Sequence, residues 1–348
     1  MAVNRHRRNP IITPQNFKPS RPDFEVVGAF NAAVTRYNDQ VLLLLRVAER
    51  PIRSQADITA TTIYDPASDT FVNKEFSHAD PRNDLSDPRM IYSPAGKFLT
   101  SFSHFRVATS DDGINFHIPD TPAFAPARPY ESFGIEDPRI TRIGDTYYID
   151  YVAVSNTGVT TALASTKDFK TFTRHGIIFC PDNKDVTIFP EKINGKFYAL
   201  HRPVTPLFEK YEIWLAQSEN LTCWGNHQHI MATQPNLWDC LRIGPSAVPF
   251  RIEQGWLEIY HGVDENLRYC LGAVLLDADN PAKIIARSKK PILAPETKYE
   301  LEGFFGNVVF NCGLLFEDDK LKIYYGVADT SIAYVEIDLN DVLKNLEL

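Results

Sequence analysis

A strand-like run recurs along this chain at intervals of about 50 to 65 residues, a period typical of repeat folds built from several strands per unit. Each copy starts at a polar turn and continues into strong β-formers. The copies are residues 38–46 (NDQVLLLLR), 96–104 (GKFLTSFSH), 144–152 (GDTYYIDYV), 195–202 (GKFYALHR), 255–263 (GWLEIYHGV) and 319–328 (DKLKIYYGVA). A period of this size predicts an all-β fold, a β-propeller.

The number of copies does not have to equal the number of blades. Strands from the two chain ends often pair within one blade, so we expect five blades, with six as the alternative. A pair of β-sandwiches would also accommodate many strands, but it does not explain regular spacing along the whole chain. Residues 1–348 are therefore expected to form one domain. Helix signals are few, and we expect one short C-terminal helix over 340–348, with Asn340 or Asp341 near its cap.

The repeated runs carry an unusual number of polar side chains. They are Arg46, His104, Asp150, His201, Arg202, His261 and, just past the last run, Asp329. The innermost strand of each propeller blade lines a central channel, so we expect these runs to be innermost and their polar residues to meet in one funnel. Buried charge is costly unless it is paired or used. A polar ligand bound at the centre is the simplest explanation.

An acidic motif at residues 134–139 (GIEDPR) lies between two β-rich segments. In a regular strand Glu136 and Asp137 would point to opposite faces. One could then face a pocket while the other braces the backbone or pairs with Arg139. The triplet Asp-Pro-Arg also occurs at 80–82 and 87–89. The copies at Asp87 and Asp137 each precede a strand-like run by a similar interval, which suggests acids presented at equivalent points of a repeat.

Charge and composition exclude several classes of protein. The net charge of −8 and the pI near 5.6 argue against a nucleic-acid partner. No apolar run reaches the roughly 18 residues of a membrane span, and the basic start lacks the apolar region of a signal peptide. Five cysteines without close pairs indicate free thiols in a reducing compartment, so we expect a cytoplasmic protein. His227 and His229 share a strand face but lack a third ligand, so no metal site is expected.

Taken together, these residues resemble glycoside hydrolase family 130, the β-mannoside phosphorylases and β-mannosidases. The stretches that carry the resemblance are residues 9–12 (NPII), 28–33 (GAFNAA), 45–49 (LRVAE), 134–139 (GIEDPR), 189–196 (FPEKINGK), 200–203 (LHRP), 260–262 (YHG), 307–310 (NVVF) and 324–330 (YYGVADT). They cover most of the chain in the family's order. The family's five-bladed propeller agrees with the repeat, and residues 45–50 and 303–313 suggest the members that act on β-1,2-linked mannose.

The resemblance implies a role for each matching residue. Asp137 corresponds to the general acid, which is thought to deliver its proton through a hydroxyl of the sugar being cleaved. Arg202, Arg242 and His261 correspond to the phosphate-binding positions, and arginine offers paired donors that suit phosphate oxygens. The positions that correspond to the pocket for the non-reducing mannose are Asn31, Arg46, Asp87 and Asp329. The Asp87 triplet could equally be a blade corner.

Glu191 leaves two reactions open. It lies close in sequence to the expected phosphate donors, where it could organise the phosphate site or hold a water as general base. We therefore expect inverting phosphorolysis of β-1,2-linked mannosides to α-mannose 1-phosphate, with an inverting β-1,2-mannosidase as the close alternative. A non-catalytic sugar-binding propeller is the third reading, which the complete acid motif opposes. Inorganic phosphate would be the co-substrate, with no cofactor, and a homo-oligomer stays open.

Overall fold

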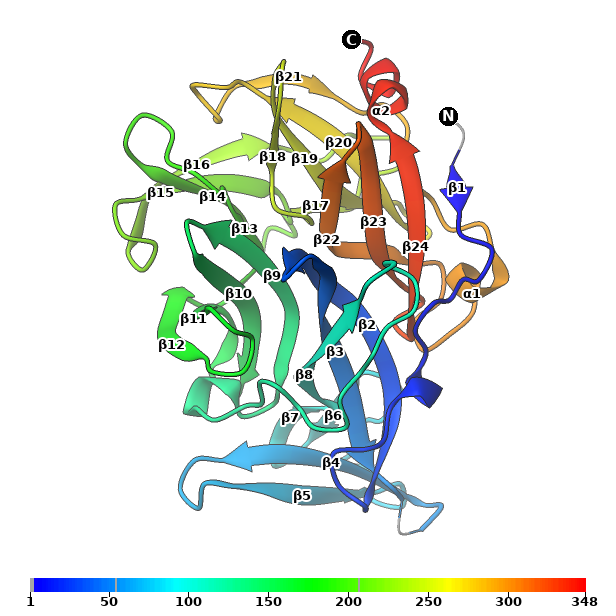
Figure 1. Ribbon diagram of the computed structural model, residues 1–348. Helices are drawn as coiled ribbons and strands as arrows, with labels where there is room; N and C mark the ends of the chain where they lie inside the picture. The colour runs from blue at the N-terminus through cyan, green and yellow to red at the C-terminus, as the bar shows by residue number, and fades with distance from the viewer. Residues whose placement is uncertain (1–2, 54, 206) are drawn as a thin grey trace.

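The computed structural model describes residues 3–53, 55–205 and 207–348, whose strands form the five blades of a propeller (Figure 1). In chain order the blades contain β2 (Phe24–Tyr37), β3 (Gln40–Pro51) and β8 (Phe102–Ser110); β9 (Ile135–Ile143), β10 (Thr146–Ser155), β11 (Gly158–Thr166) and β12 (Thr173–Phe179); β13 (Asn183–Ile188), β14 (Phe197–Pro203), β15 (Ile213–Ser218) and β16 (Trp224–Met231); β17 (Arg242–Pro245), β18 (Phe250–Ile252), β19 (Gly255–Val263), β20 (Tyr269–Leu276) and β21 (Ile284–Arg287); and β22 (Val309–Glu317), β23 (Lys320–Val327) and β24 (Ser331–Asp338) with β1 (Asn4–Arg5). The five-bladed prediction is confirmed.

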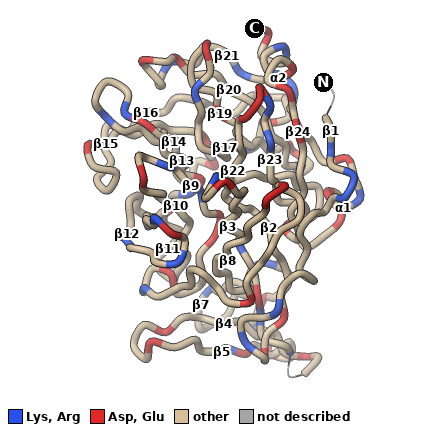
Figure 2. Tube along the Cα trace, in the orientation of Figure 1, with Lys and Arg blue, Asp and Glu red and all other residues tan. Residues whose placement is uncertain are grey.

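Five of the six repeated sequence runs are the second strands of the blades, so the expectation that the runs are innermost was wrong. The strands at the central ends of the sheets are β2, β9, β13, β17 and β22, and several of them pack directly against one another. The runs form β3, β10, β14, β19 and β23, while the run at 96–104 is split between β7 (Gly96–Leu99) and β8. Charged positions of both signs lie toward the centre, near β9, β17 and β22 (Figure 2).

The two ends of the chain meet in the last blade, as expected for a closed propeller. Asn4 of β1 pairs with Glu336 of β24 in an antiparallel ladder. The C-terminal helix α2 (Leu339–Asn345) follows β24 directly, and its cap is Asp338 instead of Asn340 or Asp341. The other helical segments are α1 (Lys298–Leu301) and two 3₁₀ turns, Pro14–Asn16 and Pro129–Glu131. Among the described residues, no helix has the length and apolarity needed to cross a membrane.

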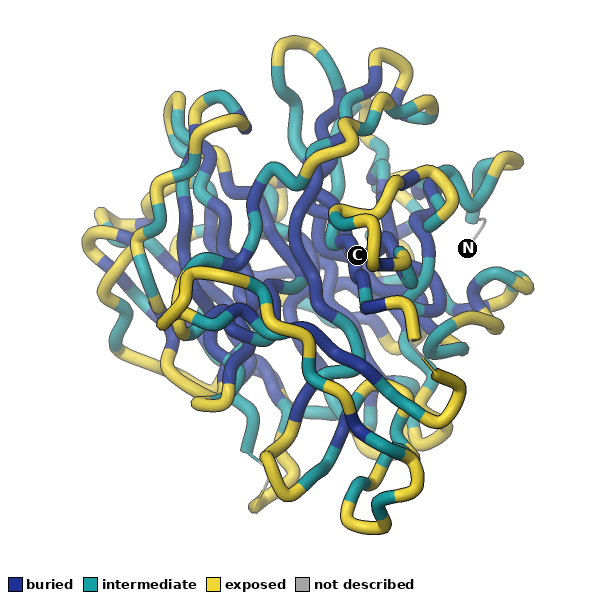
Figure 3. Tube along the Cα trace, turned by 90° about the horizontal axis from the view of Figure 1, so that it is seen from below, coloured by how far each residue is buried: buried dark blue, intermediate teal, exposed yellow. Residues whose placement is uncertain are grey.

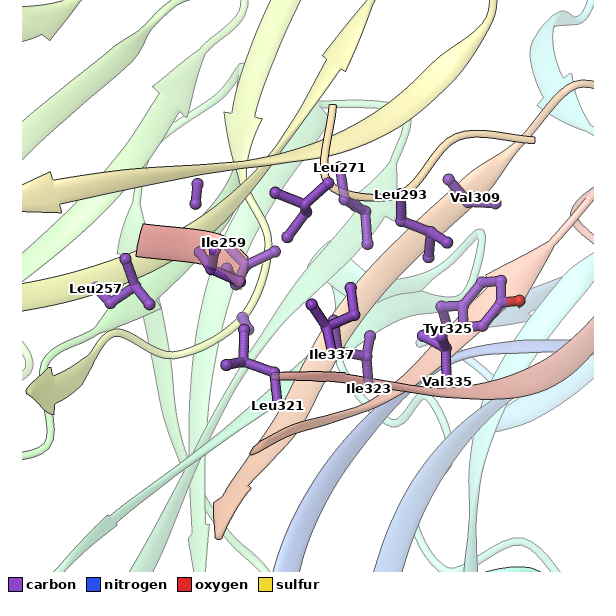
Figure 4. Packing of buried hydrophobic residues seen from close by; sticks show 14 of the residues in the cluster. Leu257, Ile259, Leu271, Leu293, Val309, Leu321, Ile323, Tyr325, Val335 and Ile337 are labelled. Atoms are coloured by element: carbon purple, nitrogen blue, oxygen red, sulfur yellow. The ribbon is translucent and has the colours of Figure 1, made fainter. Parts of the chain in front are cut away.

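Apolar side chains fill the spaces between adjacent blades. Figure 3 shows buried positions through the middle of the molecule and exposed positions on the peripheral loops. Between the last two blades, Leu257 and Ile259 of β19 pack in one cluster with Leu321 and Ile323 of β23 (Figure 4). Successive residues of a strand point to opposite faces of the sheet, so each blade packs against one neighbouring blade on one face and against the other neighbour on the opposite face. Burying such a side chain contributes roughly 1.5–3 kcal/mol, which holds the blades around the central site.

Two hairpins are inserted into the first blade, between β3 and β8. They are β4 (Ile58–Asp65) with β5 (Thr70–Ser77), and β6 (Met90–Ser93) with β7. The β4–β5 hairpin projects at the bottom of Figure 1. Asp87 lies in the turn before β6, whereas Asp137 lies within the innermost strand β9. The two Asp-Pro-Arg triplets are therefore not equivalent points of a repeat.

Candidate active site

A cavity of about 530 Å³ lies at the centre of the propeller, a size common for small-molecule sites. The predicted site residues that line it are Asn31, Arg46, Asp87, Asp137, Arg202, Arg242, His261 and Asp329. They come from both the innermost and the second strands, and from the loops that follow or precede strands. Residues of the β6–β7 hairpin form part of the wall, among them Tyr92 and Lys97. The structure thus brings together residues separated by almost three hundred positions.

Three innermost strands present a side chain to this cavity from a β-bulge. Asn31 of β2, Asp137 of β9 and Asp185 of β13 have φ values of 49°, 49° and 54°, and the ladder shifts register next to each. The left-handed conformation is costly for most residues but more accessible to Asn and Asp. A bulge redirects side chains out of the regular alternation. Local backbone geometry therefore aims all three polar groups at one space.

Arg46 holds both carboxylates of the acidic motif. Its Nη2 donates to Glu136 Oε1 at 2.7 Å, and its Nη1 donates to Asp137 Oδ1 at 3.0 Å. Asn31 Nδ2 donates to the same Asp137 oxygen at 2.9 Å. The expectation of opposite faces was wrong because the left-handed Asp137 interrupts the strand alternation. The side chain of Arg139 contacts the backbone carbonyl of Asp137 at 3.1 Å, not its carboxylate.

The pKa values of the two aspartates around Arg46, Asp137 and Asp329, are shifted in opposite directions. Burial alone would raise the pKa of Asp137, but the charges of Arg46 and Lys184 and the hydrogen bond from Asn31 hold it below its ordinary value. Burial raises the pKa of Asp329 to about 6, with Asp137 adding to the shift and Arg46 opposing it. Neighbouring carboxylates of this kind titrate as a pair. Near pH 6 the proton of the pair is therefore on Asp329, while Asp137 is ionised beside Arg46.

The predicted phosphate residues cluster at another part of the cavity. Arg202 Nε donates to Asp185 Oδ2 at 2.8 Å, and Nη2 lies 2.7 Å from the same oxygen in an ion pair. His261 Nε2 lies 3.7 Å from that oxygen. Arg242 Nη1 donates to the hydroxyl of Tyr269 at 3.3 Å. Lys184 also lines the cavity. Burial lowers the pKa of His261 to about 3, so its ring is neutral and the positive charge comes from the lysine and the arginines.

Sequence reasoning missed three residues of this site: Glu136 as a partner of Arg46, Lys184 and Asp185. A signal existed for the last two, because adjacent Lys and Asp residues occupy a short stretch, 183–188, directly before the family-like stretch 189–196. The ring of Tyr211 was also missed. The guanidinium carbons of Arg242 and Arg202 lie 5.1 and 6.0 Å from its centroid, within cation–π range.

Glu191 does not reach the cavity, which corrects the placement expected from its neighbours in sequence. Its side chain is 60% exposed and lies 4.0 Å from Arg251 Nη1. Asp87 does line the cavity, but its carboxylate accepts two hydrogen bonds from the Arg89 side chain, both at 3.1 Å. Arg89 in turn stacks on Phe305, 4.7 Å from the ring centroid. Asp87 is therefore part of the cavity wall, positioned by a turn.

Three polar residues of the repeated runs point elsewhere. His104 is buried 3.3 Å from Glu49, and Asp150 is buried opposite Arg139 in the β9–β10 ladder. His201 lies 3.1 Å from His227, and His229 lies 2.8 Å from Glu212. Among residues 3–53, 55–205 and 207–348, no group of three or more His, Cys, Asp or Glu side chains is placed to hold a metal ion. All five cysteines are unpaired.

Comparison with known proteins adds a finding of its own. The model of glycoside hydrolase family 130, described as beta-1,4-mannooligosaccharide phosphorylase, matches residues 90–348. The beta-1,2-mannobiose phosphorylase of Listeria innocua is 46% identical over 352 residues, covering 100% of this chain and 99% of the relative. Its structure in complex with beta-1,2-mannobiose superposes with a TM-score of 0.97 over 100% of this chain and 99% of its own. The 1,2-beta-oligomannan phosphorylase of a Thermoanaerobacter species is 40% identical over 252 residues, covering 72% of this chain and 83% of the relative.

These matches extend over the blades that build the cavity, and the family model includes Asp137, Arg202, Arg242, His261 and Asp329. The fold, the acidic motif and the cationic cluster therefore have one common explanation: the chain belongs to glycoside hydrolase family 130.

Proposed function

We propose that this protein is an inverting glycoside phosphorylase that cleaves β-1,2-linked mannosides with inorganic phosphate. The products are α-mannose 1-phosphate and a saccharide shortened by one mannose. The observation that carries the proposal is the presence, in one cavity, of an aspartate held by Arg46 and a cationic group formed by Lys184, Arg202 and Arg242. The names of the relatives from Listeria innocua and Thermoanaerobacter support the linkage and the use of phosphate.

Asp137 serves as the general acid in this proposal. The glycosidic oxygen must gain a proton as its bond to the anomeric carbon breaks, and a positioned carboxylic acid accelerates such a step roughly 10²–10⁴-fold. Near pH 6 the proton in the shared field of Arg46 is on Asp329, because the pKa of Asp137 is lowered and that of Asp329 is raised to about 6. In the proposal Asp137 is protonated when the mannoside is bound. It passes that proton to the leaving oxygen through a sugar hydroxyl, as the family resemblance implies, and returns to the carboxylate that pairs with Arg46.

Phosphate is the nucleophile. Arg202 and Arg242 offer charge-assisted donors to its oxygens, and Lys184 adds a third positive charge. A phosphate oxygen forms a bond to the anomeric carbon from the face opposite the leaving group while the glycosidic bond breaks. This single displacement converts a β-linkage into an α-phosphate. In this proposal phosphate is the only co-substrate, and no cofactor takes part. We place the reaction in the cytoplasm because unpaired thiols suit a reducing compartment.

Hydrolysis by the route that uses Glu191 as base is disfavoured by the position of that residue. A base must lie within hydrogen-bond reach of the water it activates, and the Glu191 carboxylate is exposed beside Arg251, outside the cavity. The test is incubation with β-1,2-mannobiose with and without phosphate. The proposal predicts mannose 1-phosphate only when phosphate is present. Mannose release at the same rate without phosphate would establish the hydrolase, and no turnover at all would favour a binding protein.

A further inference from the structure

Asp185 is a buried carboxylate at the phosphate end of the cavity with no role in the reaction described above. Its side chain is 1% exposed, and it occupies the left-handed bulge of β13. Its Oδ2 accepts a hydrogen bond from Arg202 Nε, forms an ion pair with Arg202 Nη2, and lies 3.7 Å from His261 Nε2. Its Oδ1 lies 3.5 Å from Arg139 Nη2. One carboxylate is therefore surrounded by nitrogen atoms of three residues from three different strands.

These contacts fix the direction in which Arg202 can act. Asp185 contacts Nε and Nη2, so the N–H groups that point away from Asp185, those of Nη1 above all, are the ones available to a ligand in the cavity. A guanidinium held by a hydrogen bond and an ion pair to a buried carboxylate has already lost most of its side-chain rotational freedom. A ligand that binds it does not have to order it, which favours affinity. The carboxylate thus prepares Arg202 before phosphate arrives.

A glycine on the neighbouring strand keeps this arrangement close-packed. A Cβ atom on Gly244 of β17 would lie 2.5 Å from His261 Cε1 and 2.9 Å from Asp185 Oδ2. Both distances are too short for ordinary contact, so the approach of His261 to Asp185 depends on the missing side chain. The conformation of Gly244 is not left-handed, so the requirement is for space alone.

Asp185 is also connected to the general acid. Arg139, 1% exposed, lies between them and donates from Nη1 to the carbonyl of Asp137 at 3.1 Å. Its Nε donates to the carbonyl of Ser246 at 2.9 Å, and Ser246 Oγ lies 3.1 Å from His261 Nδ1. Burial alone would raise the pKa of Asp185, but the positive charges of Arg202, Lys184 and Arg139 hold it well below its ordinary value. The carboxylate is therefore ionised, with the charges of three cationic side chains acting on it.

We propose that Asp185 is a positioning residue that orients Arg202 and His261 for phosphate, and that Gly244 provides the space it needs. The inference rests on the proposed phosphorolysis, and it explains how Arg202 is held in place to bind phosphate. A carboxylate near a phosphate dianion would otherwise repel it. Here the charge is neutralised by Arg139 and Arg202, so the carboxylate organises donors without opposing the ligand.

The test uses Asp185→Asn and Gly244→Ala in initial-rate assays with phosphate and β-1,2-mannobiose varied separately. Asn keeps the size of the side chain but removes the charge that holds Arg202, and Ala displaces His261 while every charge remains. We expect each variant to raise the KM for phosphate at least tenfold and to leave the KM for mannobiose within about twofold. Asp150→Asn is the control for a buried Asp-to-Asn change beside Arg139. Burial raises the pKa of Asp150 to about 8, so at neutral pH this variant changes the side chain without removing a charge.

The outcomes separate the inference from the function on which it rests. Suppose that the wild type depends on phosphate. If Asp185→Asn and Gly244→Ala then keep the wild-type KM for phosphate, or if their KM values for phosphate and mannobiose rise equally, the role of Asp185 is refuted but the proposed function is not. If Asp185→Asn does not fold, Gly244→Ala decides, since it removes no charge. A raised phosphate KM in Asp150→Asn would mean that any buried aspartate near Arg139 has the effect, and would also refute the inference. Phosphate-independent release of mannose by the wild type removes the proposed function and this inference together.

Discussion

Arg202 and Arg242 should respond differently to truncation, although both line the part of the cavity that we propose binds phosphate. Arg202 forms a hydrogen bond and an ion pair with the buried Asp185, whereas Arg242 is half-buried and donates to the hydroxyl of Tyr269 at 3.3 Å. Removing one partner of a buried ion pair costs about 3–5 kcal/mol of folding stability. Losing a hydrogen bond between a half-buried guanidinium and a neutral hydroxyl costs at most about 1.5–3 kcal/mol. Arg202→Ala should therefore be less stable than Arg242→Ala.

The effect on phosphate should be similar for the two variants. Each loses one charge-assisted donor, which contributes about 1.5–3 kcal/mol, or roughly a 10- to 150-fold rise in the KM for phosphate. Urea unfolding gives the stabilities, and initial rates at varied phosphate give the KM values. Equal stabilities of Arg202→Ala and Arg242→Ala would refute the buried pairing of Arg202 with Asp185. An unchanged phosphate KM in both would refute the assignment of this end of the cavity.

A double variant gives an internal check. In Arg202→Ala combined with Asp185→Asn, the uncompensated charge is gone, so most of the stability lost in Arg202→Ala should return. The KM for phosphate should stay high because the donor is still missing. A double variant whose loss of stability equals the sum of the two single losses would show that the pair does not interact as the distances indicate.

Three further predictions concern other carboxylates. Asp137→Asn should fold normally and lose roughly 10²–10⁴-fold in the rate of mannobiose cleavage, since the amide cannot supply the proton; wild-type rates would remove Asp137 as the acid. Glu191→Gln should retain wild-type phosphorolysis, because the side chain is exposed beside Arg251, and a variant without activity would restore it as a catalytic group. Burial raises the pKa of Asp150 to about 8, so its contribution to stability is full below the ordinary value of 3.8 and is lost as the pH rises through 8. The free energy of unfolding of Asp150→Asn, minus that of the wild type, should therefore be larger at pH 9 than at pH 4, by at most about 6 kcal/mol in urea unfolding. An equal difference at both pH values would refute the shift.

The regular spacing of β-forming runs, together with the expected pairing of the two chain ends in one blade, was enough to predict a five-bladed propeller. It did not predict which strand of each blade is innermost. Second strands such as β3 and β19 are covered on both sides and consist of almost continuous apolar or aromatic residues, so they give the strongest sequence signal. Innermost strands carry bulges at Asn31, Asp137 and Asp185, and those polar, left-handed positions interrupt the β pattern. The strands that carry the candidate site residues Asn31, Asp137 and Asp185 therefore have the weakest β-strand signal in the sequence.

The site was predictable where a residue carried a distinctive motif, and not where its role depends on distance in space. Asp137, Arg202 and His261 were found in motifs and line the cavity. Glu191 was misplaced because it is close to Arg202 in sequence. It lies in the loop between β13 and β14, whereas Arg202 lies near the other end of β14. Contacts across blades, such as Asp185 with His261, have no signature in a single sequence.

The reaction of β-1,2-mannobiose with inorganic phosphate, followed by NMR from the first minutes, tests whether phosphate attacks the anomeric carbon opposite the leaving sugar. The account predicts α-mannose 1-phosphate and mannose in equal amounts, with no cleavage when phosphate is omitted. Formation of the β-phosphate would contradict the single displacement, and two mannose molecules released per mannobiose without phosphate would contradict phosphorolysis itself.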